Sequence, residues 1–282
     1  MSPRIQQLTE MSWVEIEALD KDKTVILLPI SPIEEHGPHL PVGTDIFGAH
    51  DIAQLAAINV VEKNSTLQPI LSPTIPLGCA PITADFPGTI SIRGKTLYNL
   101  LVDFCSGLAD SGFKYIVIVN HHLDSMHLKA ILEAIETVCE RYGIKMIETA
   151  GRILYSRMPL DEITKSEEMG LSMKTEIHAD VRETSFIQYK YPHLIKQDLE
   201  ELPSVHIDIR DGLKKGLKTF KAMGAGQGYI GTPARATKAL GKIHLEEQAE
   251  ITAEMIIQLI SGQPLPEMSP GILKYLKESI QL

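Results

Sequence analysis

Carboxylates and imidazoles are concentrated in a segment of twelve residues near the start of the chain. It reads Glu34-Glu35-His36-Gly37-Pro38-His39-Leu40-Pro41-Val42-Gly43-Thr44-Asp45, and it is too rich in glycine and proline to be a helix. Oxygen and nitrogen donors this close together can hold a divalent transition metal. Without a cation or a proton between them, the carboxylates would repel one another. The alternative is a surface loop of acids with one or two hydrogen-bonded histidines.

A second group of polar residues, Asn120-His121-His122-Leu123-Asp124-Ser125, follows another apolar segment. A histidine and an aspartate two residues apart in an extended loop can point into one cleft. The two segments together offer enough donors for two metal ions that share one carboxylate, namely Glu34, His36, Asp45, His122 and Asp124. The alternative is that Asp124 or Ser125 caps a helix and that the histidines are solvated.

A third candidate is the segment Glu176-Ile177-His178-Ala179-Asp180-Val181-Arg182-Glu183-Thr184-Ser185. As a functional site it would use His178 as a general acid or base, because an imidazole can transfer protons near neutral pH. Glu183 would then orient or charge that ring. Alternatively, Asp180 and Glu183 cap a helix and interact with its dipole, and His178 is structural.

Strand and helix patterns alternate along the chain, and they must position these segments. Continuous apolar runs predict strands over 24–30, 67–75, 115–119 and 144–147, and helical spacing predicts helices over 44–61, 97–108, 125–142 and 234–260. Such alternation is typical of an α/β fold with a mostly parallel sheet between two layers of helices. In such folds, chemistry lies at the carboxyl ends of the strands. After Glu183 the pattern weakens into lysine- and glycine-rich loops as far as Gly231. We expect a single domain over 1–282 with a tail from about residue 262.

Composition narrows the functional class. The chain has 282 residues, of which 44% are hydrophobic and 22% charged, and its formal net charge of −9 argues against nucleic acids and anionic membranes as partners. Cys79, Cys105 and Cys139 form no CxxC pair, which excludes a thiolate zinc site of that pattern. The first twenty residues lack the features of a secretory signal, and no apolar run could span a membrane. We therefore expect a cytoplasmic protein.

The motifs together resemble the creatininase family of creatinine amidohydrolases. The resemblance rests on the first segment, Phe86-Pro87-Gly88-Thr89, Asn120 to Ser125, His178-Ala179 with Glu183-Thr184-Ser185, and Gly231-Thr232-Pro233-Ala234-Arg235-Ala236-Thr237, in that order. It implies a three-layer α/β/α fold, two divalent ions (zinc or manganese) and a homohexamer. It also implies that one ion is bound by Glu34 and His122, the other by His36 and Asp124, that Asp45 bridges them, and that His178 transfers protons.

The implied activity is hydrolysis of a small cyclic amide or related carbonyl compound by metal-activated hydroxide. Leu123 and Lys174 stand where creatininases carry aromatic residues, and Asp124 is shorter than their glutamate. We therefore expect a substrate other than creatinine. Other branches of the family hydrolyse a formamide or open a keto-inositol ring by cleaving a carbon–carbon bond; Arg93, His121 and Lys174 would suit a polyhydroxylated or anionic compound. A different class of protein, a metal-containing small-molecule binding protein, is the remaining alternative.

Overall fold

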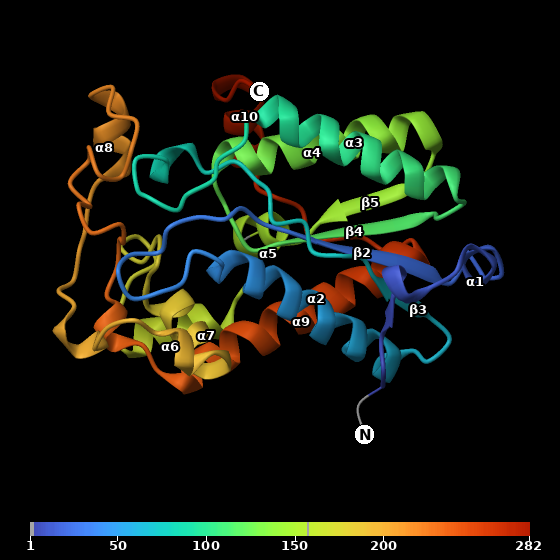
Figure 1. Ribbon diagram of the computed structural model, residues 1–282, viewed down its shortest axis with the longest axis horizontal. Helices are drawn as coiled ribbons and strands as arrows, with labels where there is room; N and C mark the ends of the chain where they lie inside the picture. The colour runs from blue at the N-terminus through green and yellow to red at the C-terminus, as the bar shows by residue number, and fades with distance from the viewer. Residues whose placement is uncertain (1–2, 157) are drawn as a thin grey trace.

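The computed structural model describes residues 3–156 and 158–282 and contains a parallel sheet between two layers of helices (Figure 1). The strands are β1 (Gln6–Gln7), β2 (Thr24–Ile30), β3 (Gln68–Leu71), β4 (Tyr115–Asn120) and β5 (Lys145–Glu148), in the order β1-β3-β2-β4-β5. Each neighbouring pair is parallel. This arrangement confirms the predicted three-layer α/β fold.

Helices cover both faces of the sheet, α3 and α4 on one side and α2 and α9 on the other (Figure 1). The α-helices are α1 (Trp13–Glu17), α2 (Thr44–Lys63), α3 (Gly94–Asp110), α4 (Ser125–Tyr142), α5 (Ala150–Tyr155), α6 (Asp161–Glu168), α7 (Val181–Lys190), α8 (Ile209–Lys214), α9 (Lys238–Ser261) and α10 (Pro270–Ser279). Among the described residues, no helix has the length and apolarity that crossing a bilayer would require.

Each face of the sheet has its own hydrophobic core because side chains alternate along a strand. In β2, Val25 and Leu27 pack toward α2 and α9, whereas Ile26 and Leu28 pack toward α3 and α4. All seven residues of β2 are buried, as expected for a central strand covered on both sides. The layers therefore fix the carboxyl end of β2, from which the first acidic segment leaves.

Several elements differ from their sequence-based ranges. Strand β3 ends at Leu71, short of the predicted residue 75, and Ile75 makes an isolated bridge to Ile30. Helix α9 begins at Lys238 because the Thr237 side chain accepts a hydrogen bond from the Leu240 amide. The segment treated as a tail contains α10, in which Leu276 is buried.

Helices α7 and α9 cross so closely that α9 requires a glycine at the crossing. A Cβ atom added to Gly241 would lie 1.9 Å from the carbonyl oxygen of Ser185 in α7. We expect Gly241→Ala to destabilise the protein by about 3 kcal/mol, because two helices must separate to relieve the overlap. The matched control is Gly107→Ala in α3, where an added Cβ meets no atom within 4 Å. It should stabilise by about 0.5–1 kcal/mol through helix propensity. Urea unfolding of both variants checks this; equal effects would contradict it.

Candidate metal centre

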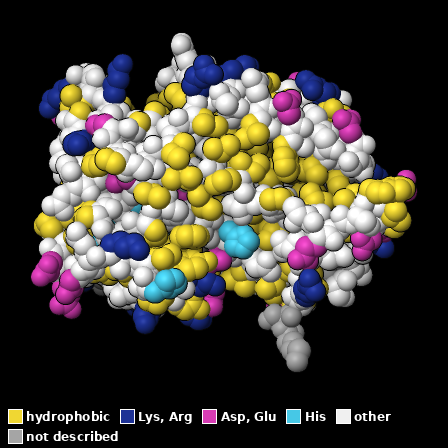
Figure 2. Space-filling model, viewed as in Figure 1, with side chains coloured by type: hydrophobic (Ala, Val, Ile, Leu, Met, Phe, Trp, Pro, Cys, Tyr) yellow, Lys and Arg dark blue, Asp and Glu magenta, His cyan; other side chains and the backbone are white. Residues whose placement is uncertain are grey.

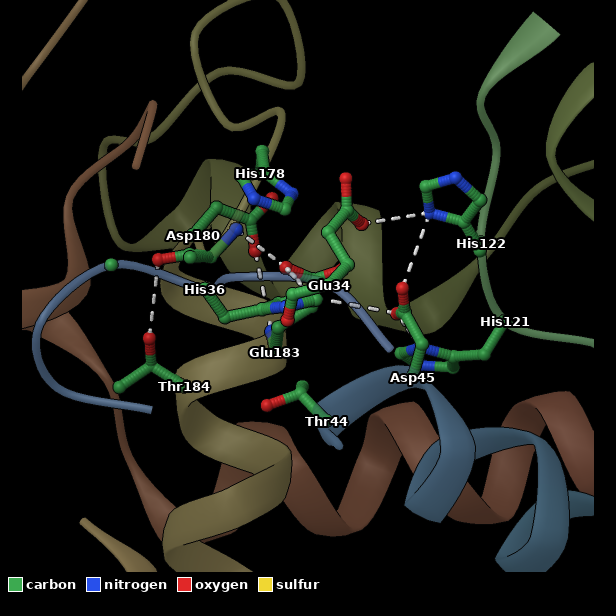
Figure 3. Close-up of polar contacts among 12 residues, drawn as sticks. Glu34, His36, Thr44, Asp45, His121, His122, His178, Asp180, Glu183 and Thr184 are labelled. Carbon is green, nitrogen blue, oxygen red and sulfur yellow. Dashed lines mark hydrogen bonds and ion pairs between the residues drawn. The ribbon is translucent and has the colours of Figure 1, made fainter. Parts of the chain in front are cut away.

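The candidate site lies at the carboxyl ends of β2 and β4, where five acidic and imidazole side chains converge (Figure 3). They are Glu34 and His36 from the loop after β2, Asp45 from the first turn of α2, His122 from the loop after β4, and Glu183 from the first turn of α7. The first four are buried and Glu183 is half-buried. Segments far apart in sequence thus supply one polar cluster inside the protein.

The side chains form two groups that share Asp45. Glu34, Asp45 and His122 make one group, in which His122 Nδ1 lies 2.9 Å from Glu34 Oε2 and 3.2 Å from Asp45 Oδ2. His36, Asp45 and Glu183 make the other, in which His36 Nε2 lies 3.5 Å from Asp45 Oδ1 and 3.8 Å from Glu183 Oε2. Within each group the candidate ligand atoms lie within 4.8 Å of one another, which is close enough to surround one ion.

Backbone carbonyls orient both imidazoles toward the carboxylates. His36 Nδ1 donates to the carbonyl of Glu34 (3.0 Å), and His122 Nε2 donates to the carbonyl of Cys79 (2.9 Å). A ring nitrogen facing a carbonyl must carry the hydrogen, so in the neutral ring the other nitrogen has a free lone pair. Those nitrogens, His36 Nε2 and His122 Nδ1, are the ones that face the acids. Metal-binding histidines are held by such outer contacts.

Hydrogen bonds also hold the carboxylates in place; Glu34 is held through one oxygen and turns the other toward His122, whereas Glu183 uses the same oxygen for both contacts. Thr83 donates its hydroxyl to Glu34 Oε1 (2.6 Å), and the Ala179 amide donates to Glu183 Oε2 (2.6 Å) from a backbone with φ of +45°. Among the described residues, the buried atoms Glu34 Oε2, His36 Nε2 and Asp45 Oδ2 have no partner in hydrogen-bond geometry and face only the oppositely charged side chains of the cluster. Such atoms are costly to bury unless something binds them. The donor set therefore fits divalent cations.

In the absence of metal, the imidazoles compensate the acids by holding protons. Burial lowers the pKa of His36, but the Asp45 carboxylate and its hydrogen bond outweigh this and raise it to about 10. Burial also lowers the pKa of His122, and Glu34 and Asp45 raise it well above the ordinary value. Burial raises the pKa of Asp45, yet His36 and the hydrogen-bonding histidines bring it well below the ordinary value.

These shifts predict that metal binding releases protons. His36 and His122 must become neutral to bind a cation, and both are protonated in the metal-free site near pH 7.5. We expect about two protons to leave on saturation with zinc, and the apparent affinity to increase with pH. Calorimetric titration in buffers of different ionisation enthalpy measures this number. A heat of binding that is the same in every buffer would contradict the prediction.

Asp124 lies outside both groups. It is the N-cap of α4, and its Oδ1 accepts the amides of Met126 (2.8 Å) and His127 (3.3 Å). This is the capping alternative weighed from the sequence. None of the candidate metal groups among the described residues contains Asp124; the carboxylate grouped with His36 and Asp45 is that of Glu183, whereas the resemblance implied Asp124. Binding of metal by Asp124 is therefore not favoured by the geometry.

His178 lies against the centre, as the sequence predicted, but a different glutamate contacts it. Its ring centroid is 4.6 Å from that of His36, and His178, Glu34 and His36 form a third compact group. His178 Nε2 donates to the carbonyl of Glu35 (2.9 Å) and lies 3.5 Å from Glu35 Oε1. Burial lowers the pKa of His178, whereas Glu34 raises it, and the net shift is upward. Glu183 makes no hydrogen bond to this ring among the described residues; it faces His36 instead.

Behind Asp45 lies a row of buried, contacting polar side chains that the sequence did not predict. His121 Nδ1 donates to Asp45 Oδ1 (2.9 Å), and His121 Nε2 contacts His244 Nε2 (2.9 Å). His244 Nδ1 donates to Glu162 Oε2 (2.5 Å). Gly48 leaves room for this ring, because an added Cβ would lie 2.5 Å from the His121 ring. His121 therefore supports the shared carboxylate.

Of the three side chains expected to bind substrate, two lie away from the cavity beside the centre. Arg93 and Lys174 are exposed, and neither lines the cavity beside the centre. His121 does line that cavity, but its ring nitrogens are engaged with Asp45 and His244. The structure thus does not support the expectation that these three residues bind a polyhydroxylated or anionic substrate.

The loop that carries His122 is anchored by Asn120, which is next to a buried acid. Asn120 Oδ1 accepts the His122 amide (2.9 Å), and its Nδ2 lies 3.5 Å from Glu148 Oε1. Burial raises the pKa of Glu148 from 4.5 to about 7, although the Gly151 amide partly offsets this. Between pH 4.5 and about 7, Glu148 therefore keeps a proton in the folded protein that it has lost in the unfolded chain.

Glu148→Gln is accordingly expected to stabilise the protein at high pH only. Above pH 4.5 the wild-type folded state binds the extra proton, so this group lowers stability as pH rises toward 7, by about 3 kcal/mol in all. The glutamine side chain does not titrate, so the variant does not lose stability in this range. The difference in the free energy of unfolding between variant and wild type should therefore be larger at pH 8 than at pH 5. Urea unfolding at both values measures it, with exposed Glu136→Gln as the control. The same difference at both pH values would contradict the prediction.

Comparison with known proteins places this arrangement in a broader context. The family model described as "Creatininase: Creatinine amidohydrolase" matches residues 9–256. The 3-dehydro-scyllo-inosose hydrolase of Thermotoga maritima is 22% identical over 93% of this chain and 86% of its own length. The mycofactocin precursor peptide peptidase of Mycobacterium ulcerans is 31% identical, but over 42% of this chain and 48% of its own length.

Solved structures show the same fold. A crystal structure of creatinine amidohydrolase (creatininase) superposes with a TM-score of 0.73, at 23% identity, over 91% of this chain and 98% of its own. A structure named "Creatininase Mn" and a variant creatininase described as Zn-Zn type each have a TM-score of 0.72, at 22% identity, over 91% of this chain and 99% of theirs.

Proposed function

The chain belongs to the creatininase family, and from this premise we propose that it is a hydrolase with a two-metal centre that acts on an amide or related carbonyl compound. The observation that carries the proposal is the pair of ligand groups that share Asp45, each with an imidazole lone pair facing carboxylates. Relatives in this family are named as hydrolases of different compounds, which supports hydrolysis more strongly than any one substrate.

In this proposal, Glu34, Asp45 and His122 hold one divalent ion, and His36, Asp45 and Glu183 hold the other. Zinc and manganese are favoured because nitrogen and carboxylate oxygen suit them and because creatininase structures are named for both metals. When bound, such ions supply an activated water as the nucleophile and a Lewis acid for the carbonyl. Asp45 keeps the two sites adjacent, and His121 fixes the orientation of Asp45.

His178 moves the proton in the proposed reaction. Its Nε2 hydrogen is bound by the Glu35 carbonyl, so Nδ1 is the nitrogen that can give a proton to the departing nitrogen or take one up. Glu35 keeps its own place through the Gly37 amide (2.9 Å) and through Thr89, whose hydroxyl accepts the Glu35 amide (3.0 Å). The Phe86–Thr89 motif therefore positions the residue that orients the proton donor.

Ring opening of a keto-inositol by carbon–carbon cleavage is the second candidate, favoured by the inosose hydrolase relative. There His178 would protonate the departing carbon. Formamide hydrolysis requires the same groups. A metal-containing binding protein would instead need a closed ligand shell without open positions. The cavity beside the centre reaches Glu34, His122 and Glu183, which favours access for a substrate.

Chelation and reconstitution test the proposal. Dialysis against a chelator should abolish hydrolysis in a screen of cyclic amides, formamides and keto-inositols, and Zn²⁺ or Mn²⁺ should restore it. Elemental analysis of the active protein should count two ions per chain. Full activity in metal-stripped protein, or zinc bound at saturation with no hydrolysis anywhere in the screen, would overturn the hydrolase proposal.

The family further suggests a homohexamer in the cytoplasm that acts on a small molecule. We propose this assembly for the chain. Sedimentation equilibrium measures the mass of the particle, for which six copies of the 31.2 kDa chain are expected. A monomer at micromolar concentration would contradict the assembly without affecting the proposed chemistry.

A further inference from the structure

A cavity of about 620 Å³ opens beside the metal centre, and most of its lining is apolar. Glu34, His122, His178 and Glu183 border it on the side of the centre. A volume of this size is typical of sites that enclose a ligand much larger than a small cyclic amide. The side of the cavity next to the centre therefore suits the polar, reacting part of a ligand, and the apolar walls suit an apolar group of the same ligand.

One wall comes from the C-terminal segment, beyond the residues that the family model matches. Tyr275 in α10 and Ile280 just after it line the cavity, whereas the family match ends at residue 256. The family model therefore does not include the residues of this wall.

The C-terminal wall is fixed to α4 by specific contacts. Lys129, itself buried, donates from Nζ to the carbonyls of Ile280 (2.6 Å) and Lys277 (3.2 Å). Leu276 is buried in a small cluster with Leu128 of α4. A lysine held between two carbonyls and a buried leucine hold the segment in a defined place, so Tyr275 and Ile280 can act as a shaped surface.

Another part of the wall comes from α8 and the loop after it. Ile209, Leu213 and Phe220 line the cavity there, and α8 lies at the upper left of the molecule, away from the sheet (Figure 1); Figure 2 shows the molecule from the same side. Leu213 is 48% exposed. Apolar side chains at the rim of a cavity lose contact with water when an apolar ligand enters.

We infer that the substrate is a carbonyl compound with a bulky apolar group, which Tyr275 and Ile280 select. The inference rests on the proposed function, because it places the reacting carbonyl at the metal centre. Polar side chains such as Arg182 and Lys218 also line the cavity, but Ile280 and the Tyr275 ring give the hydroxyl groups of a polyhydroxylated ring few partners on their side of it, and burying hydroxyl groups unpaired is costly. Creatinine is too small to fill a cavity of 620 Å³.

Hydroxamates test the inference without knowledge of the substrate. Acetohydroxamate and octanohydroxamate carry the same metal-chelating group and differ only in the apolar chain. Calorimetric titration into zinc-loaded protein should show octanohydroxamate binding about thirtyfold more tightly. Tyr275→Ala and Ile280→Ala should each reduce that ratio about fivefold while leaving the acetohydroxamate affinity within twofold.

Leu273→Ala is the matched control, because Leu273 lies in the same helix, is 44% exposed and does not line the cavity. It should leave the ratio unchanged. A wild-type ratio near one, or an equal loss in Leu273→Ala and Tyr275→Ala, would overturn the inference. If neither hydroxamate binds, the metal centre itself has failed, and retained acetohydroxamate binding shows that a variant is folded.

Discussion

Asp45→Ala is expected to yield a folded protein that retains neither metal ion and has lost hydrolytic activity by a factor on the order of a thousand or more. Asp45 is the one residue that belongs to both ligand groups, so its removal takes a carboxylate oxygen from each. It also removes the carboxylate that His121 contacts and the nearer of the two that face His36. Elemental analysis after dialysis should find less than about one tenth of an ion per chain.

Single-group variants make the Asp45 result interpretable. His122→Ala removes a ligand from one group and Glu183→Ala from the other, so each should retain about one ion. Asp103→Ala, an exposed position in α3, should retain two. Two ions in Asp45→Ala would show that the shared carboxylate does not bridge, and would remove the basis of the proposed centre.

His178→Ala is expected to leave both ions in place and to lower kcat by about 10²–10⁴-fold. The ring lies beside His36, but it is outside the two groups that share Asp45. Its loss therefore removes a proton-transfer group and leaves both ligand groups complete. In the wild type, kcat should decline at high pH as His178 loses the proton that it would give to the leaving group. That decline should disappear in the variant.

Metal content and the pH profile separate catalysis from folding at this position. Exposed His193→Ala should match the wild type in both measurements. Loss of metal in His178→Ala would identify His178 as a ligand, in line with its compact grouping with Glu34 and His36. Unchanged kcat with two ions present would show that another group moves the proton.

The layered fold was predictable because its signals are local. The apolar runs of β2 and β4 are short and rich in β-branched or aliphatic residues, which favours strands covered on both faces. Helix α10 was missed because its helical residues follow a proline-containing stretch and bury one side chain, Leu276, against a neighbouring element. Its stability depends on contacts such as Lys129 with the last carbonyls, and these have no local signal.

The sequence by itself determined the chemistry at the carboxyl ends of the strands: the donor types, the motif order and Glu34, His36, Asp45 and His122 as metal ligands to be tested. Tertiary structure alone decided which carboxylate accompanies His36. Asp124 and Glu183 both lie near a helix start, but Asp124 uses its oxygen to cap α4, whereas the Ala179 amide turns Glu183 toward His36. A carboxylate's direction depends on the donors that surround it in space, and those donors come together only when β2, β4 and α7 have packed.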